Sequence, residues 1–143
     1  MAQVKETKPD AHRYQYAVKI ICTANIPGTS QTTGSLLPGV YQTVVNIHNP
    51  HYETVRYRMK IAVAGTSQIS KFVKEELGPD HAIRVNCDRI TTDFGITFIH
   101  GVEGFLVIES DDSLDVVAVY TAGQVGGQVE SLDVEHVRER KIE

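Results

Sequence analysis

The chain has 143 residues, of which 41% are hydrophobic and 22% are charged, and its formal net charge is −4. This length suits a single domain with a core of its own. No block of Lys and Arg provides the charge that binding to phosphate backbones requires, and no apolar run approaches the ~20 residues of a membrane-spanning helix, so nucleic acid and a membrane span are excluded. The N-terminal residues lack the apolar segment of a secretory signal. This predicts a cytoplasmic protein, or one exported after removal of a leader.

The first part of the chain combines a polar arm, a strand and a long loop. Residues 1–13 are polar and are expected to form a flexible arm, so that residues 14–143 make up one domain. Residues 14–22 alternate between apolar and polar side chains, which predicts a strand. Residues 25–38 are rich in Gly, Pro, Ser and Thr and predict a loop longer than most connections within a domain.

Two strands are expected to follow, joined by a turn. Residues 40–48 form the first, and the Asn-Pro sequence at residues 49–52 is typical of a turn. Residues 55–63 alternate over nine positions, which predicts one face in the core and one basic face in solvent. We therefore predict a β-hairpin whose second strand presents the cations Arg56, Arg58 and Lys60.

The middle of the chain is less regular. Residues 69–77 fit either a helix or a strand, whereas residues 81–87 alternate as a strand does. Residues 87–90 are expected to form one helical turn. Residues 96–100 and 104–109 are predicted to be strands, or one strand interrupted at a glycine.

The segment GFLVIESDDSLDVVAVYTA, residues 104–122, has two apolar runs rich in β-branched residues on either side of a polar tip. It predicts a hairpin that is apolar on both faces and lies in the middle of the core. Residues 123–127 should form a flexible loop and residues 129–137 the last strand. The sequence thus predicts an all-β fold, an antiparallel β-sandwich of about eight strands, immunoglobulin-like or jelly-roll-like. The expected core comprises Val18, Ile20, Val44, Tyr57, Met59, Ile61, Val85, Phe105, Val107, Val117 and Val119.

The two cysteines, Cys22 and Cys87, each lie in an apolar alternating run. In a cytoplasmic protein we expect both to be reduced core residues. Their wide separation also resembles that of the bridged pair in immunoglobulin domains, although the chain has no tryptophan to pack on such a bridge, so a disulfide is the alternative.

Residues that could perform chemistry are scattered. His48 and His51 flank the Asn-Pro turn without the second Cys/His pair that a structural zinc site needs. The acidic tip, Glu109 to Asp115, lacks the spacing of a calcium loop. No nucleophile elbow or phosphate-binding glycine loop occurs. We therefore predict no enzyme activity, no catalytic residue, no metal and no cofactor.

Surface charge provides the candidate interaction residues. The cations of residues 55–63 could meet acidic side chains of the last strand as cross-strand partners, within one molecule or between two. The alternative is a solvated sheet face that prevents aggregation. The residues concerned are Arg56, Arg58, Lys60, Asp133 and Glu135.

Four blocks of the chain cover most of residues 39–142: GVYQTVVNIHNPHYETVRYRMKIAVA, KEELGPDHAIRVNCDRI, GFLVIESDDSLDVVAVYTA and SLDVEHVRERKI. In these blocks the chain resembles a group of small bacterial β-sandwich proteins of unknown function. The order of elements is also similar to that of sensory rhodopsin transducer proteins. This second likeness is one of architecture and implies no functional residue.

These observations favour a non-enzymatic structural or assembly module. Its sheet edges and terminal segments would add to the sheet of a neighbouring copy, giving a ring, a filament or another homo-oligomer. The alternative is a protein-partner- or ligand-binding module of a signalling or surface system that uses residues 25–38 and 123–127, since binding residues concentrate on loops.

Overall fold

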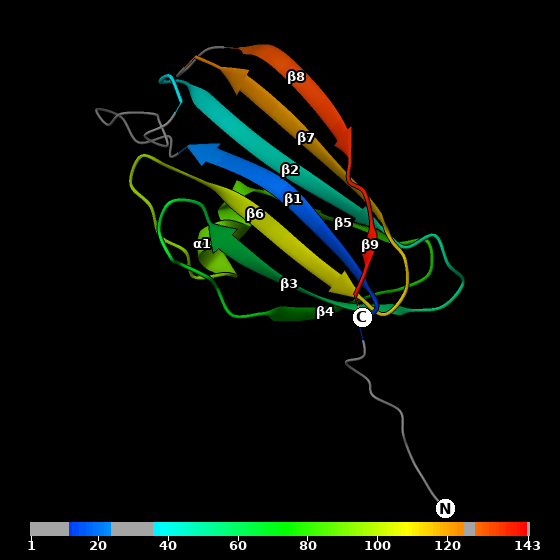
Figure 1. Cartoon of the computed structure of the whole chain (residues 1–143). Helices are drawn as coiled ribbons and strands as arrows, with labels where there is room; N and C mark the ends of the chain where they lie inside the picture. The colour runs from blue at the N-terminus through cyan, green and yellow to red at the C-terminus, as the bar shows by residue number, and fades with distance from the viewer. Residues whose placement is uncertain (1–11, 24–35, 125–127, 143) are drawn as a thin grey trace, which may run out of the picture.

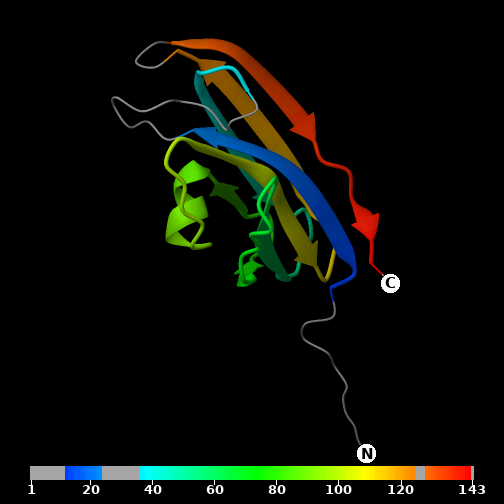
Figure 2. The same ribbon diagram turned by 60° about the vertical axis from the view of Figure 1, so that its left-hand side comes forward.

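The computed structural model describes residues 12–23, 36–124 and 128–142, and their strands stack in two antiparallel sheets (Figures 1 and 2). The five-stranded sheet has the order β4-β3-β6-β1-β9, and the four-stranded sheet has the order β5-β2-β7-β8. The all-β sandwich expected from the sequence is confirmed. The strands are β1 (Tyr14–Thr23), β2 (Val40–His48), β3 (Val55–Val63), β4 (Val73–Leu77), β5 (Ala82–Val85), β6 (Gly101–Ser110), β7 (Asp115–Gly123), β8 (Val129–His136) and β9 (Arg140–Lys141).

The short elements mostly follow the sequence pattern. The helical turn expected after β5 is α1 (Cys87–Thr92), and the ambiguous segment at residues 69–77 contains β4. The strand expected at residues 96–100 is wrong, because the chain is irregular there and β6 begins at Gly101. β6 passes very close to β3: a Cβ atom on Gly104 would lie 2.2 Å from the backbone oxygen of Ala62, so only glycine fits.

Both predicted hairpins are wrong. β6 pairs with β1 and β3, whereas β7 pairs with β2 and β8, so the chain crosses from one sheet to the other at residues 111–114. β2 and β3 also lie in different sheets. The 104–122 segment therefore lies in the core as two opposed layers, and no ladder of hydrogen bonds joins its halves.

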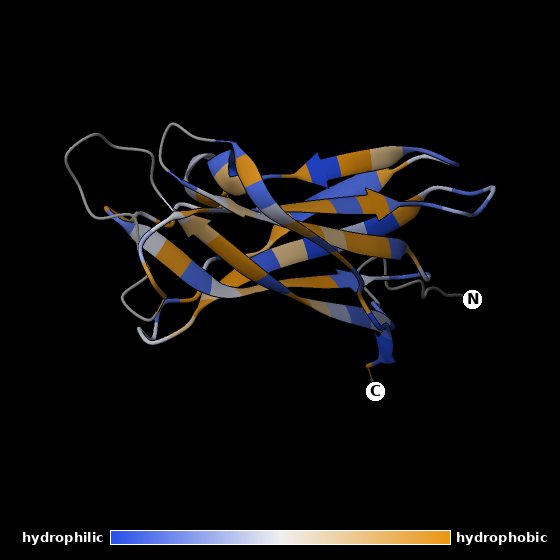
Figure 3. Ribbon diagram, turned by 90° about the horizontal axis from the view of Figure 1, so that it is seen from above, coloured by the Kyte–Doolittle hydropathy of each residue, from blue (hydrophilic) through white to orange (hydrophobic). Residues whose placement is uncertain are grey.

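The core lies between the sheets. The alternation of hydrophobic and hydrophilic residues along the strands is visible as bands in Figure 3. Of the expected core residues, Val18, Ile20, Tyr57, Met59, Ile61 and Val85 are buried. The other five, Val44, Phe105, Val107, Val117 and Val119, are partly or largely exposed on the outer faces, and their neighbours Val45, Leu106, Ile108, Val116 and Ala118 take the inner positions.

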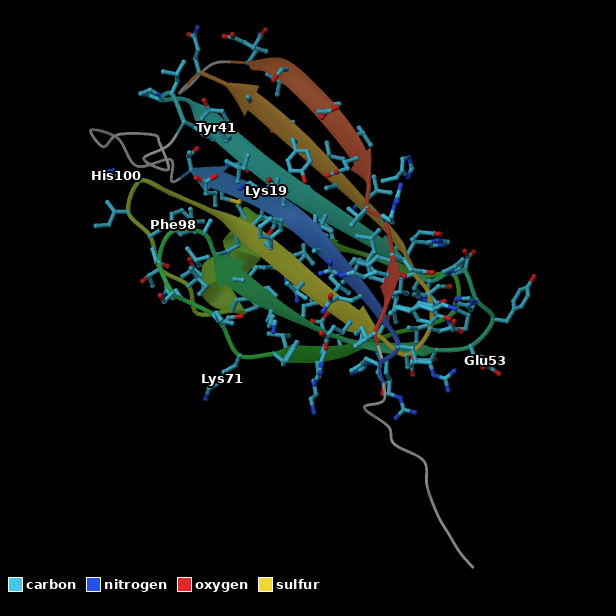
Figure 4. The ribbon with its side chains drawn as sticks, in the orientation of Figure 1. Lys19, Tyr41, Glu53, Lys71, Phe98 and His100 are labelled. Carbon is cyan, nitrogen blue, oxygen red and sulfur yellow. A yellow bond between two sulfur atoms is a disulfide. The ribbon has the colours of Figure 1, made fainter. Side chains whose placement is uncertain are left out.

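Two features connect the sheets. Cys22 at the end of β1 and Cys87 at the start of α1 form a disulfide with a Cα–Cα distance of 5.9 Å, so the expectation of reduced cysteines is wrong. β1 and β2, which carry Lys19 and Tyr41, also lie side by side (Figures 1 and 4). There the hydroxyl of Thr43 accepts a hydrogen bond from the N–H of Ile21 at 2.8 Å and donates to its carbonyl at 3.0 Å.

Candidate interaction edge

The strand β8 forms one edge of the four-stranded sheet, and all eight of its residues are exposed. The N–H of Val137 donates to the carbonyl of Val116 at 2.9 Å, and this bond sets the alternation of the antiparallel β7–β8 ladder. Residues 133 and 135 accordingly bond to β7. The backbone N–H and C=O groups of Leu132, Val134 and His136 point away from β7, toward solvent.

The outward face of this edge is apolar. Leu132 and Val134 lie on the same face of the strand, and their exposed fractions are 62% and 49%. In the ladder Val134 lies opposite Val119, which in turn lies opposite Val44 of β2. An apolar row thus crosses the outer face of the sheet and ends at a free edge.

The other face of β8 is acidic. Glu135 lies beside the hydroxyl of Tyr120, which is 3.1 Å from a carboxylate oxygen of Glu135 and 2.7 Å from the carbonyl of Lys19. Burial and the Glu135 carboxylate both raise the pKa of Tyr120, so this hydroxyl keeps its proton. Asp133 is exposed, and no ion pair joins it to any residue in the described ranges.

The chain continues along the same border into a basic segment. β9 pairs with β1, and the N–H of Ile142 donates to the carbonyl of Arg13 at 2.7 Å. Residues 138–141 are all exposed, and the carboxylate of Glu139 accepts a hydrogen bond from the hydroxyl of Tyr16 at 2.9 Å. Figure 2 shows β8 and β9 one after the other along the outer border of the molecule.

The cations expected on β3 lie on the outer face of the five-stranded sheet, but they are already engaged. Arg58 forms an ion pair of 2.7 Å with Glu109, and its guanidinium lies 4.0 Å from the ring centre of Phe72. Lys60 lies over the same ring at 4.9 Å, and Arg56 lies 3.9 Å from Asp111. Burial disfavours the Glu109 carboxylate, but its bonds to Arg58 and Gln15 lower its pKa overall.

The predicted pairing of these cations with Asp133 and Glu135 inside one molecule is therefore wrong. β3 belongs to the five-stranded sheet and β8 to the four-stranded sheet, so the two strands are never neighbours. The carboxylate partners of Arg58 and Arg56 come from β6 and the residues just after it, a choice that depends on sheet order rather than on local sequence.

The two histidines at the Asn-Pro turn take part in separate polar contacts. Nδ1 of His48 lies 2.7 Å from Asp115, and Nε2 lies 2.8 Å from Asp80. His51 instead contacts the carbonyl of Ser113 at 2.7 Å. Because the two carboxylates bind opposite nitrogens of the His48 ring, they share no point where a metal ion could sit. Across the described ranges no three His, Cys, Asp or Glu side chains are placed to hold one.

The contacts of His48 predict a pH dependence of stability. Its carboxylate partners, Asp115 first and then Asp80, raise the pKa of His48 above its ordinary value. This contribution is therefore fully present below the pKa of the unfolded state, about 6.5, and is lost as the pH rises through the higher pKa of the folded state. Urea unfolding of wild type and His48→Gln should show a larger difference in unfolding free energy at about pH 5.5 than at about pH 8.5. A difference independent of pH would contradict this.

Comparison with known proteins gives one informative result. No family model matches the chain, and no curated protein matches it. The fold is similar to that in the crystal structure of Thermotoga maritima 1070, with a TM-score of 0.56 over 90% of this chain and 95% of that one. The sequence identity is 15%, so the likeness concerns the fold alone.

The loops proposed as an alternative binding site fall largely outside the described residues, since 24–35 and 125–127 are not described. A shallow cavity next to the second loop, lined by Val40, Gly123 and Val129 among others, has a volume of about 70 Å³, well below that of a typical ligand pocket. No helix in the described part of the chain is long and apolar enough to cross a membrane. The β8 edge is thus the feature with the best defined capacity for interaction.

Proposed function

We propose that this chain is a non-enzymatic structural module that self-associates through a sheet edge, and that the edge is β8. The observation that carries the proposal is the outward row of backbone groups at Leu132, Val134 and His136, which lies next to exposed aliphatic side chains. A strand with free N–H and C=O groups is a template for another strand. A neighbouring copy that adds here would bond to the backbone and cover the apolar row at once.

The fold itself supports the choice of β8. At the opposite edge of the same sheet, β5 has only four residues, and its apolar Val85 is buried. Short edge strands are a common way of preventing association. β8 is twice as long, with eight residues, and its aliphatic side chains are exposed.

A proline placed on each edge tests the proposal. Val134→Pro removes an outward N–H but no bond to β7, and edge strands tolerate such a proline. We expect it to raise the dissociation constant of the homo-oligomer at least about tenfold, since two copies lose apolar contact and backbone bonds. The measurement is sedimentation velocity over a wide range of concentration.

The matched control is Arg84→Pro on β5. The bond from the N–H of Asn49 to the carbonyl of His81 places the N–H of Arg84 on the outward side of that edge as well. This variant should associate as wild type does. A wild-type chain that stays monomeric at high concentration would refute the proposal, as would equal effects of the two prolines.

We infer membership of the uncharacterised group of small bacterial β-sandwich proteins, and a likeness of plan to the sensory rhodopsin transducers, from the sequence blocks quoted above. We also predicted a cytoplasmic location from the N-terminal residues. The Cys22–Cys87 bridge argues instead for an oxidising compartment, because disulfides seldom persist in the cytoplasm.

A further inference from the structure

The last strands of the chain separate charge along one border of the molecule. Glu130, Asp133 and Glu135 lie in the first half of the segment 129–142, which we call the border segment. Arg138, Arg140 and Lys141 lie in the second half. The intervening Glu139 is exposed as well, and its carboxylate accepts a hydrogen bond from the hydroxyl of Tyr16. The border segment therefore has an acidic end on β8 and a basic end on β9.

These charges are not neutralised inside the molecule. None of the ion pairs among the described residues includes any of the six side chains. Arg140 donates to the neutral side chain of Gln15 at 2.7 Å, and Glu135 contacts Tyr120. The cations of β3 differ in this respect, since Arg58 is held by Glu109 and Phe72. The border segment thus carries exposed charges of both signs that no ion pair neutralises within the described residues.

The charge pattern selects the orientation of a second copy. If two β8 strands paired alone, with Leu132 opposite Val134, the two Asp133 side chains would face each other in the close, non-hydrogen-bonded position, which is unfavourable. A parallel arrangement would place acidic end on acidic end. An antiparallel arrangement about a two-fold axis near Val137 places each acidic end against a basic end.

We propose that the occupant of this border is a second copy of the chain, arranged antiparallel so that the acidic end of each border segment faces the basic end of the other. This inference rests on the proposed self-association and adds its orientation and its electrostatic basis. A two-fold contact of this kind buries the same surface on both copies and closes, so it produces a dimer rather than a filament. Raising the salt concentration should weaken it, because exposed charges are screened.

Charge reversal provides the test. One variant carries Glu130→Lys and Asp133→Lys, and the other carries Arg138→Glu and Lys141→Glu; no hydrogen bond or ion pair involves these four side chains within the described residues. In a homodimer of either variant, like charges would face each other across the contact. Each variant alone should therefore raise the dimer dissociation constant at least about tenfold. An equimolar mixture opposes unlike charges and should form a heterodimer. A chain with all four changes should form a homodimer again.

The control carries Glu53→Lys and Asp88→Lys, which change the net charge by the same amount as Glu130→Lys and Asp133→Lys, at exposed positions away from the border segment. It should dimerise as wild type does, and a thermal melt of every variant should confirm folding. If wild type associates but the mixture does not form a heterodimer, this inference is overturned while self-association stands. If wild type is monomeric throughout, both fail. An open series of species growing with concentration would also overturn the two-fold contact.

Discussion

Removing the disulfide with Cys22→Ala and Cys87→Ala should lower the free energy of unfolding by about 4 kcal/mol. The bridge closes a loop with a sequence separation of 65 residues, and the chain entropy that such a loop removes from the unfolded state corresponds to about 4 kcal/mol at room temperature. For a chain of this size the melting temperature should fall by roughly 10 to 20 °C. Urea unfolding and calorimetry measure the two quantities.

Reduction of the wild-type protein is the companion experiment. Dithiothreitol should lower the wild-type melting temperature and leave the double variant unchanged, because the variant has no sulfur to reduce. Before reduction the native and urea-unfolded chain should take up no iodoacetamide by mass spectrometry, and afterwards two equivalents. A wild-type melt insensitive to reductant, together with two reactive thiols, would show that the cysteines are not bridged.

The sequence predicted the strands well because period-two burial is a local property. β3 is the clearest case: Tyr57, Met59 and Ile61 are buried, and the cations between them lie on the outer face of the sheet. When one face of a strand is polar, the side chains that point outward can be predicted without knowing which strand lies beside it.

Pairing between strands could not be predicted in this way. β6 and β7 are apolar on both faces, so nothing local fixed which face is buried, and Phe105 and Val107 were assigned inward although Leu106 and Ile108 are the buried residues. The short tip between them fits a hairpin and a crossing between sheets equally well. A turn signal shows that the chain reverses, but it does not show which sheet it enters.

Only part of the candidate interaction edge could be predicted, because strand pairing again depends on sheet order. Asp133 and Glu135 lie on the exposed edge, as expected of a charged last strand, but their intramolecular partners on β3 depended on sheet order. The exposure of Leu132 and Val134 could not be predicted, because the apolar face of an alternating strand is normally buried. The expectation of reduced cysteines depends on a cytoplasmic location, whereas their wide separation in the sequence is compatible with the disulfide.

Asn49 is the residue whose replacement should destabilise the fold most among single polar changes. Its side chain is completely buried, and its amide nitrogen lies 2.8 Å from the carbonyl of Glu53, 2.9 Å from that of Leu77 and 3.1 Å from that of Gly78. Its side-chain oxygen accepts from the N–H of His51 at 2.8 Å. One amide therefore joins the β2–β3 crossing to the β4–β5 connection, at the end of the sandwich marked by Glu53 in Figure 4.

We expect Asn49→Ala to lower the free energy of unfolding by about 3 kcal/mol, because buried carbonyls and one N–H lose their partner. Asn49→Asp should cost more at neutral pH, since a carboxylate would face carbonyl oxygens and could donate only when protonated. That arrangement raises the carboxyl pKa in the folded state, so the deficit of the Asp variant should grow as the pH rises above the unfolded pKa of about 3.9, whereas that of the Ala variant should not. Asn46→Asp, at an exposed position of β2 shortly before Asn49, is the control and should change stability by less than about 0.5 kcal/mol. Urea unfolding at about pH 4 and about pH 7 separates these outcomes, and equal deficits of the Ala and Asp variants at both pH values would show that the Asn49 amide does not donate to these carbonyls.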